Sequence, residues 1–306
     1  MTTHIAGIDK PKIIAIVGPT ASGKSALAVE LARAFNGEII SADSRQVYRG
    51  LNLGTGKITR SEMRGVRHHL LDVASPTSRS PFTVAQFKNM GSAAIADILS
   101  RGKVPIICGG TGFYIHTLID DVTLPDVPPN PPLRTKLEKK TTEELFSLLQ
   151  HKDPSRAGTI DPHNKPRLIR ALEIVEALGV VPRTHHTSPY NTYMIGILTD
   201  KDTLANAIEQ RIDIRLKKGM IAEARRLHAQ GLSWKRMHAL GLEYRFLALH
   251  LQGTITRAQM HDALLTETKQ YAKRQMTWFK RDKRIQWFPL TKKKALHTAV
   301  ASFLSS

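Results

Sequence analysis

The sequence has little cysteine and no long apolar run. Cysteine occurs once, at Cys108, so no intrachain disulfide can form, which is typical of a reducing compartment. No apolar run approaches the roughly 18 residues that a membrane-spanning helix needs, and residues 1–12 lack the apolar segment of a signal peptide. We therefore expect a cytoplasmic protein in which Cys108 is a small core residue.

Acidic residues are also scarce. The 306 residues contain 26 Asp and Glu against 45 Lys and Arg, a net charge of +19. Residues 203–306 hold 20 of the basic and 7 of the acidic residues, a net charge of +13. An excess concentrated in one third of the chain predicts a polyanionic partner such as a nucleic acid. No strongly apolar helix face accompanies the charge, which disfavours a membrane surface, and the uneven distribution argues against a generally basic proteome.

A phosphate-binding motif lies near the N-terminus. Residues 18–25 read GPTASGKS, which fits the P-loop pattern G-x-x-x-x-G-K-[ST], and a β-branched run precedes it while helix formers follow. The loop's N–H groups can bind an anion at the helix N-terminus, where Lys24 adds a charge and Ser25 a ligand for Mg²⁺. The pattern alone leaves open whether the ligand is a nucleotide or another diphosphate. The predicted diphosphate-binding residues are Gly18, Pro19, Thr20, Ala21, Ser22, Gly23, Lys24 and Ser25.

The surrounding sequence predicts an α/β fold, a P-loop NTPase-like parallel sheet flanked by helices. Predicted strands at 37–43, 104–108 and 193–198 join the strand before the P-loop. Ligands of such sheets bind at the carboxyl ends of the strands, where Asp43 and Thr111 fall. Spacing alone favours a helix N-cap over a catalyst for Asp43, and leaves Thr111 as either a cap or a phosphate contact.

A proline-rich connector at 124–133 interrupts this core and precedes a stretch that reads as helices. We therefore divide the chain into the first part of a P-loop core at 1–121, an all-helical insertion at 122–190, and the second part of the core, with basic C-terminal helices, at 191–306. Within the core, residues 50–80 read as loops. The adjacent His68 and His69 in these loops are poorly placed to ligate one zinc ion.

Residues 269–284 combine charge with aromatic rings. Seven basic residues and one acidic residue interleave with Tyr271, Trp278 and Phe279. Such a mixture suits nucleic acid, since cations hold phosphates and rings stack on bases. It equally suits a helix that packs an apolar stripe into the core and exposes a basic face.

Seven motifs occur in the order typical of one family. They are GPTASGKS at 18–25, SADSRQVYRGLNLGT at 41–55, HHLLDV at 68–73, CGGTGFY at 108–114, KPRLIRALEI at 165–174, ALGLEYR at 239–245 and QYAKRQMTWFKR at 270–281. The chain therefore resembles the tRNA dimethylallyltransferases, also called isopentenyl-diphosphate:tRNA transferases, over most of its length. The pairing of GPTASGKS with DSRQVY is highly specific.

The resemblance implies an alkyl transfer rather than nucleotide hydrolysis. The P-loop would hold dimethylallyl diphosphate with Mg²⁺. The acceptor would be the exocyclic amine of the adenosine 3′ of the anticodon in tRNAs that read codons beginning with U. Asp43 carries over as the base that takes the amine proton, in place of a capping role. The groups that would stabilise the leaving diphosphate are Lys24, Ser25 with Mg²⁺, Thr111 and Arg215, the last chosen over Arg211.

The family also implies a monomer that clamps the anticodon stem-loop and flips the adenosine out of its stack. The tRNA-binding residues that carry over are Asp43, Ser44, Arg45, Gln46, Thr111, Arg134, Lys165, Pro166, Arg167, Leu168, Ile169, Met237, Gly241, Arg245, Lys273 and Arg274. Many bacterial relatives read G-Y-K/R-E where this chain has Gly241-Leu-Glu-Tyr-Arg245, which displaces the tyrosine. The zinc finger of eukaryotic relatives is absent, so no zinc is expected.

Three other functions share parts of this pattern. An adenylate isopentenyltransferase would use the same donor and a free nucleotide, but it would not need the basic C-terminal third. A small-molecule P-loop kinase would use Asp43 to activate a hydroxyl, and the same basic region argues against it. A non-catalytic RNA-binding protein would use the P-loop as a nucleotide sensor and would tolerate the loss of Asp43.

Overall fold

The computed structural model describes residues 10–78, 80–182 and 188–306, which belong to two compact units. One unit combines Met1–Asp121 with Ser188–Ser306, and the other is Val122–Thr187. No helix in the described ranges is long and apolar enough to cross a membrane.

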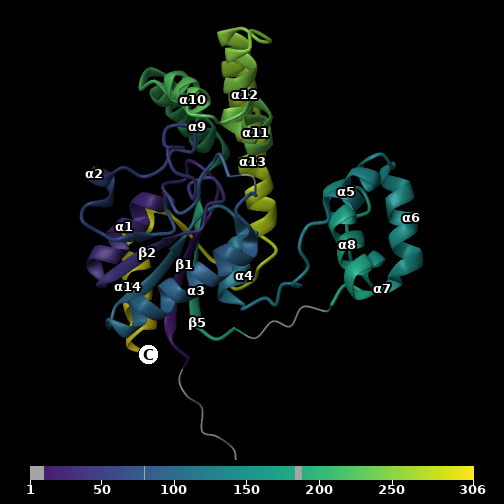
Figure 1. The fold of residues 1–306 in the computed structure, drawn as a ribbon. Coiled ribbons are helices and arrows are strands. Elements are labelled where there is room, and N and C mark those ends of the chain that lie inside the picture. Colours follow the sequence, from purple (N-terminus) through teal and green to yellow (C-terminus); the bar gives the residue numbers. More distant parts are fainter. Residues whose placement is uncertain (1–9, 79, 183–187) are drawn as a thin grey trace, which may run out of the picture. The chain divides into compact units, whose positions relative to one another are not determined.

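The first unit is built on a parallel six-stranded sheet with the order β3-β2-β4-β1-β5-β6. Figure 1 shows strands of this sheet with helices packed around them. The strands are β1 Lys12–Val17, β2 Gly37–Ser41, β3 His68–His69, β4 Val104–Cys108, β5 Asn191–Leu198 and β6 Gln286–Pro289. The central strand β1 pairs with β4 and β5 and leads directly into the glycine loop. The predicted α/β fold is confirmed, whereas the sequence did not indicate β6.

Helices cover both faces of this sheet. Successive side chains of a strand point to opposite faces, and the side chains of β1 are apolar on both, so each face must be buried. Ile14 and Ile16 of β1 pack on the face covered by α1 and α14, and Ile13 and Ala15 pack on the face covered by α3, α4 and the end of α13. The helices of this unit are α1 Lys24–Ala34, α2 Arg60–Met63, α3 Val84–Ser100, α4 Gly112–Ile119, α9 Lys201–Lys217, α10 Met220–Ala229, α11 Trp234–Leu240, α12 Leu242–Leu251, α13 Arg257–Phe279 and α14 Lys293–Ser305, with the 3₁₀ turn η1 at Leu290–Lys292.

The stretch 50–80 contains more regular structure than the loops expected from the sequence. Helix α2 begins at a capping box, in which Thr59 and Glu62 bond to each other's main-chain N–H groups. Strand β3 adds only two residues to the edge of the sheet. Both elements are too short to produce a hydrophobic period, which explains why the sequence pattern did not reveal them.

Helices α9 to α12 and part of α13 enclose a separate core. Its buried residues include Leu227, Met237 and Leu247, and the segment after β2 contributes Val47 and Leu51. This packing places α9 and α10 against the segment that follows the second strand, close to the carboxyl edge of the sheet.

Within its described residues the second unit has helices as its regular elements, as the sequence predicts for 134–179, and the connector at 122–130 is irregular. Leu145, Leu149, Leu168 and Leu172 form its core. The buried carboxylate of Glu173 accepts two hydrogen bonds. One comes from the main-chain N–H of Asn130, the N-cap residue of α5, and the other from the side chain of Arg134 in α5. The helices are α5 Pro131–Glu138, α6 Thr142–Lys152, α7 Pro154–Ala157 and α8 Lys165–Leu178.

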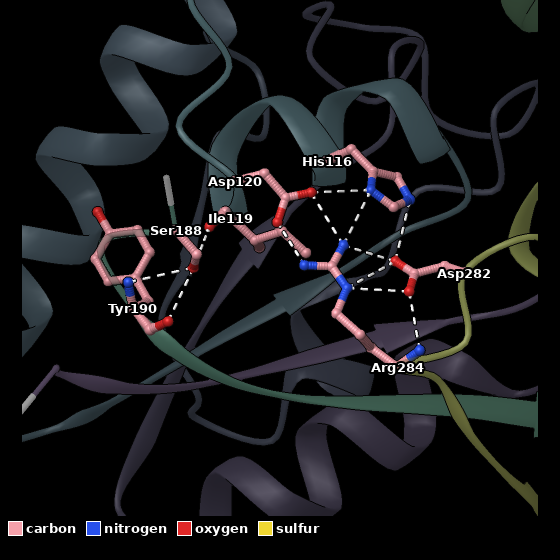
Figure 2. Close-up of polar contacts among 7 residues, drawn as sticks. All are labelled: His116, Ile119, Asp120, Ser188, Tyr190, Asp282 and Arg284. Atoms are coloured by element: carbon pink, nitrogen blue, oxygen red, sulfur yellow. Dashed lines mark hydrogen bonds and ion pairs between the residues drawn. The ribbon is translucent and has the colours of Figure 1, made fainter. Parts of the chain in front are cut away.

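A charged network holds the end of α4 within the first unit (Figure 2). Arg284 donates to the two carboxylate oxygens of Asp120 at 2.5 and 3.0 Å, and His116 Nδ1 lies 3.2 Å from the same carboxylate. Burial opposes the ionisation of Asp120, yet the hydrogen bonds from His116 and Arg284 hold its pKa well below the usual range. The hydroxyl of Ser188 donates to the main-chain oxygen of Ile119 at 2.8 Å, so both ends of the insertion leave from fixed points of the core.

Candidate active site

The P-loop forms a tight turn between β1 and α1. Gly18 and Gly23 have φ values of 145° and 87°, which residues with side chains rarely adopt. The hydroxyl of Ser22 is buried and has no hydrogen-bond partner within the described part of the chain. Buried polar atoms are normally paired, so this loop retains unused capacity to bind a polar ligand.

Lys24 is the first residue of α1, and its ammonium group is buried. Its Nζ donates to the main-chain oxygen of Pro19 at 2.5 Å, within the loop itself. Burial is the main cause that lowers the pKa of Lys24 to about 8; Arg211 acts in the same direction, and Asp43 acts against it. An anion bound at the loop would favour the charged form and raise the pKa again.

A pocket lies at the carboxyl edge of the sheet beside the P-loop. Its charged residues are Lys24, Asp43 and Arg211. Its apolar residues are Ala28, Ile39, Ile58 and Leu71, and the others are Thr20, Ser25, Ser41, Gln46, Thr55, His68, Cys108, Gly109, Gly110, Tyr271 and Gln275. The pocket therefore combines cations, a carboxylate and an apolar surface.

Asp43 stabilises a turn at residues 44–47 and also lines the pocket. Its Oδ1 accepts the main-chain N–H groups of Arg45 and Gln46 at 2.8 and 3.2 Å. No hydrogen bond engages Oδ2 among the residues described, and the side chain lines the pocket. The helix N-cap that the spacing favours is not formed, because residues 44–47 are a turn. Oδ1 holds this turn, and Oδ2 can meet a substrate without a movement of the side chain.

Two further pocket residues are neutral at pH 7. Burial lowers the pKa of His68 and raises the pKa of the Cys108 thiol to about 11. Asp43 is therefore the anionic group among the pocket residues. Cys108 packs in the core, as the sequence predicts, and also reaches the pocket wall.

Thr111 connects the two loops that leave β2 and β4. It stands at the N-cap position of α4, but its hydroxyl accepts the main-chain N–H of Ser44 at 3.1 Å instead of capping that helix. The loops are in close contact, since a Cβ at Gly109 would lie 2.1 Å from the main-chain oxygen of Ala42. Thr111 thus fixes the segment that carries Asp43, although its own side chain is not among the pocket residues.

Helix α13 contributes two pocket residues that the motifs do not point to, Tyr271 and Gln275. The buried Gln275 accepts the N–H of Thr20 at 2.8 Å and donates to the oxygen of Gly110 at 2.9 Å, so it joins the P-loop to the loop after β4. Tyr271 lies one turn earlier, and burial raises its pKa above the usual range. Tyr271 and Gln275 are four residues apart, so the sequence could have indicated that they lie on one face of a helix.

The two arginines of α9 occupy different places. Arg211 lines the pocket and donates to the oxygen of Gly56 at 3.0 Å. Burial, together with Arg215, lowers the pKa of Arg211 to about 10, so it is still charged at pH 7. Arg215 is buried and donates to the oxygen of Gly54 at 3.0 Å, outside the pocket. The structure therefore brings Arg211, the second choice from the sequence, next to Lys24 and Asp43.

The residues predicted to bind tRNA differ in exposure. Leu168, Ile169 and Met237 are core residues, so their side chains are not available to an RNA. Arg134 pairs with the buried Glu173 at 2.7 Å inside the second unit. The half-buried members of the set are Ser44, Arg45, Gln46, Thr111, Lys165 and Gly241, and the exposed ones are Pro166, Arg167, Arg245, Lys273 and Arg274.

A second group of potential metal ligands lies outside the pocket. Ligand atoms of Glu38, His69 and Asp97 fall within 4.8 Å of one another. However, the carboxylate of Glu38 already bonds to Arg101 and Lys103, at 2.5 and 2.8 Å. Arg101 and Lys103 already neutralise the carboxylate of Glu38 and occupy its oxygens, so we assign no metal to this cluster.

The fold and this pocket define a P-loop α/β protein with a carboxylate beside its phosphate loop. The family model described as IPP transferase matches residues 46–282. The tRNA dimethylallyltransferase of Syntrophomonas wolfei is 41% identical over 286 residues, which cover 90% of this chain and 91% of that protein. The chain belongs to the IPP transferase family.

Solved structures agree with this assignment. The full-length tRNA isopentenylpyrophosphate transferase of Bacillus halodurans aligns with a TM-score of 0.74 at 38% identity, covering 97% of each chain. A eukaryotic dimethylallyltransferase that acts on tRNA shares the fold, with a TM-score of 0.80 at 24% identity over 96% of this chain and 80% of that one.

Proposed function

We propose that this chain transfers a dimethylallyl group from dimethylallyl diphosphate to the exocyclic amine of the adenosine 3′ of the anticodon, in tRNAs that read codons beginning with U. The observation that carries the proposal is a single pocket that contains a phosphate loop, an apolar wall and the Asp43 carboxylate. The similarity to proteins named tRNA dimethylallyltransferase supports the same reaction.

The donor fits the two surfaces of the pocket. Its diphosphate would bind the N–H groups of the P-loop and the cations Lys24 and Arg211. Its branched hydrocarbon would contact the apolar wall, which includes Ile39 and Ile58. We assign Arg211, rather than Arg215, to the diphosphate because only Arg211 of the two is a pocket residue.

The transfer forms one bond and breaks another. The amine nitrogen attacks the primary allylic carbon, the bond from that carbon to the diphosphate oxygen breaks, and its electron pair leaves with the diphosphate. The nitrogen's proton passes to Asp43, because an aromatic exocyclic amine is a poor nucleophile that needs a base. Lys24 and Arg211 stabilise the negative charge that develops on the leaving group.

Mg²⁺ is the cofactor that suits this pocket. Ser25 would hold it, since this residue lines the pocket directly after Lys24 and hard cations prefer oxygen ligands such as a hydroxyl. When bound, the ion would offset part of the diphosphate charge. The unpartnered hydroxyl of Ser22 is consistent with a ligand-binding loop.

The acceptor side rests on exposed positive charge. Arg245, Lys273 and Arg274 in the first unit and Arg167 in the second are exposed and can contact phosphates. An adenylate isopentenyltransferase would have no use for this basic surface. We extend the proposal to a monomeric enzyme of the cytoplasm, in keeping with its single buried cysteine.

The decisive experiment offers several acceptors to the same donor. Radiolabelled dimethylallyl diphosphate and Mg²⁺ would be incubated with an anticodon stem-loop that carries the target adenosine, with the same stem-loop carrying guanosine, and with AMP and ATP. Label on the adenosine stem-loop alone is the expected result. Label on AMP or ATP would replace the proposal with an adenylate isopentenyltransferase, and an absence of label on every acceptor would contradict the transfer.

A further inference from the structure

The loop 50–57 contributes one residue to the pocket, and its main chain is held from both sides. Thr55 of this loop is a pocket residue. Gln46, also in the pocket, directs its amide nitrogen toward the oxygens of Thr55 and Gly56, at 3.4 and 3.5 Å. The conformation of the loop therefore determines part of the pocket's shape.

The N–H side of the loop converges on one buried carboxylate. Glu223 of α10 is 3% exposed. Its Oε2 accepts the N–H groups of Asn52 and Leu53 at 3.2 and 2.8 Å. Its Oε1 accepts the N–H of Gly54 at 3.0 Å and the hydroxyl of Tyr244 at 2.7 Å. Three consecutive main-chain donors thus depend on a single side chain.

The carbonyl side of the loop contacts the arginines. Arg215 donates to the oxygen of Gly54, and Arg211 donates to the oxygen of Gly56, each at 3.0 Å. A Cβ at Gly56 would lie 2.2 Å from Arg211 Nη2, so guanidinium and backbone are in direct contact. A shift of the loop must therefore move the Arg211 guanidinium in the pocket.

Tyr244 supports the loop by packing as well as by its hydroxyl. A Cβ at Gly54 would lie 2.5 Å from Tyr244 Cζ, so the ring lies directly against the loop backbone. This residue is the displaced tyrosine of the GLEYR sequence. Its ring is buried, and it faces Glu223 rather than solvent.

We propose that Glu223 is a positioning residue of the donor site, which acts through loop 50–57 on Arg211 and Gln46. The inference rests on the proposed function, in which Arg211 binds the diphosphate. Its physical basis is that a buried N–H without an acceptor is costly, so loss of this carboxylate drives the loop into another conformation.

The substitution Glu223→Gln tests this with little change in size. The amide replaces one acceptor oxygen with an N–H₂ group, which would face main-chain N–H donors. Tyr244→Phe removes one donor to Glu223 and keeps the ring. Glu38→Gln is the matched control, because Glu38 is an equally buried carboxylate of the same unit that lies outside the pocket.

Measurements of three kinds separate positioning from general stability. They are the Tm, the Kd of inorganic diphosphate with Mg²⁺ by calorimetry, and the kcat and KM for the donor and for the stem-loop, all measured well below the Tm. Glu223→Gln should weaken diphosphate binding and raise the donor KM about tenfold, while the stem-loop KM changes less than about twofold. Tyr244→Phe should give about a threefold effect, and the double variant less than the product of the two because they share one network.

Glu38→Gln should lower the Tm and leave the diphosphate Kd and donor KM unchanged. The inference is overturned if Glu223→Gln lowers the Tm in the same way but keeps a wild-type diphosphate Kd. Equal increases in the donor and stem-loop KM would also overturn it. If the wild type transfers no label, the proposed function fails, but the diphosphate Kd still tests the role of Glu223. Should Glu223→Gln not fold, Tyr244→Phe provides the same test.

Discussion

Two clusters of charged side chains in the first unit differ in how fully their charges are paired. Glu38, near the amino end of β2, bonds to Arg101, Lys103 and His69. At the carboxyl edge of the sheet, Lys24 donates to a main-chain oxygen, and Asp43 uses one of its two carboxylate oxygens. The first cluster is complete within the protein, whereas the second retains unused charge and hydrogen-bonding capacity.

The pKa values of Glu38 and Lys24 are both lowered, but the shift favours the charged form of Glu38 and disfavours the charged form of Lys24. Hydrogen bonds from Arg101, opposed by burial, hold the pKa of Glu38 well below its usual range, so the charged form is stabilised. Glu38 therefore stabilises the fold above its unfolded pKa of 4.5, and this contribution is lost as the pH falls. Burial lowers the pKa of Lys24, so its charged form costs stability below about pH 8, and the cost disappears as the pH rises toward 10.5. A charge that the fold disfavours is typical of a functional site.

The largest test of this contrast is substitution of Asp43. Asp43→Ala should lower kcat by roughly 10² to 10⁴, the usual contribution of a general base, while the Kd of the stem-loop changes little. Asp43→Asn keeps an oxygen for the N–H groups of Arg45 and Gln46 but cannot take a proton. It should lose kcat to a similar extent and keep the wild-type Tm. Single-turnover kinetics and a binding assay give both quantities, and an equal loss of binding and turnover would contradict the role as base.

Lys24 predicts a pH dependence of donor binding. Its side chain attracts diphosphate as the protonated ammonium. The Kd of diphosphate should therefore be constant below about pH 8 and rise about tenfold per pH unit above it. Calorimetry with inorganic diphosphate and Mg²⁺ from pH 7 to about 9.5, below the pKa of Arg211 near 10, would measure this. Lys24→Met should bind more weakly with a flat profile. A wild-type profile that is flat as well would show that another group binds the diphosphate.

Arg211 and Arg215 show the same contrast within helix α9, because Arg211 lines the pocket and Arg215 is paired inside the protein. Arg211→Gln should raise the donor KM about tenfold with a small change in Tm, since a pocket cation is lost. Arg215→Gln should mainly lower the Tm and raise the donor KM less than Arg211→Gln does, because this buried side chain holds the oxygen of Gly54 in loop 50–57 and pairs with Glu243 at 3.3 Å. Steady-state kinetics with thermal unfolding would separate them, and a reversed pattern would restore Arg215 as the diphosphate contact.

Local sequence was sufficient for the strands β1, β2, β4 and β5 and for the phosphate loop, but not for the short edge strands β3 and β6. The β-branched run before Gly18 and the helix formers after Lys24 are adjacent to the motif they support, so the strand-loop-helix unit could be predicted. Asp43 required the family resemblance, because its spacing alone favoured a cap. The structure shows a turn at residues 44–47 instead of a helix, and Asp43 holds this turn through the N–H groups of Arg45 and Gln46.

The remaining site residues could not be predicted because their partners are distant in sequence. Gln275 bonds to Thr20 across 255 positions, and Glu223 bonds to Leu53 across 170. No local pattern records such contacts. Arg211 and Arg215 share a helix face, as their spacing predicts, but the loop they contact decides which one reaches the pocket.

The smallest expected effect concerns the exposed pair Lys273 and Arg274. Arg274 lies over the ring of Tyr271 at 5.9 Å, while Ala272 and Gln275 face inward, so α13 has both the buried stripe and the basic face that the sequence left as alternatives. Changing both cations to Gln should weaken stem-loop binding several-fold and lower the salt slope by roughly 1.4, as expected for two single-strand phosphate contacts.

The matched control for this pair is Lys293→Gln with Lys294→Gln. These neighbouring lysines are exposed on α14, which packs on the opposite face of the sheet from α13. The control should leave the salt slope unchanged, so that a difference between the two variants measures a local contact rather than the net charge of +19. Equal slopes for both variants and the wild type would show that Lys273 and Arg274 face solvent away from the RNA.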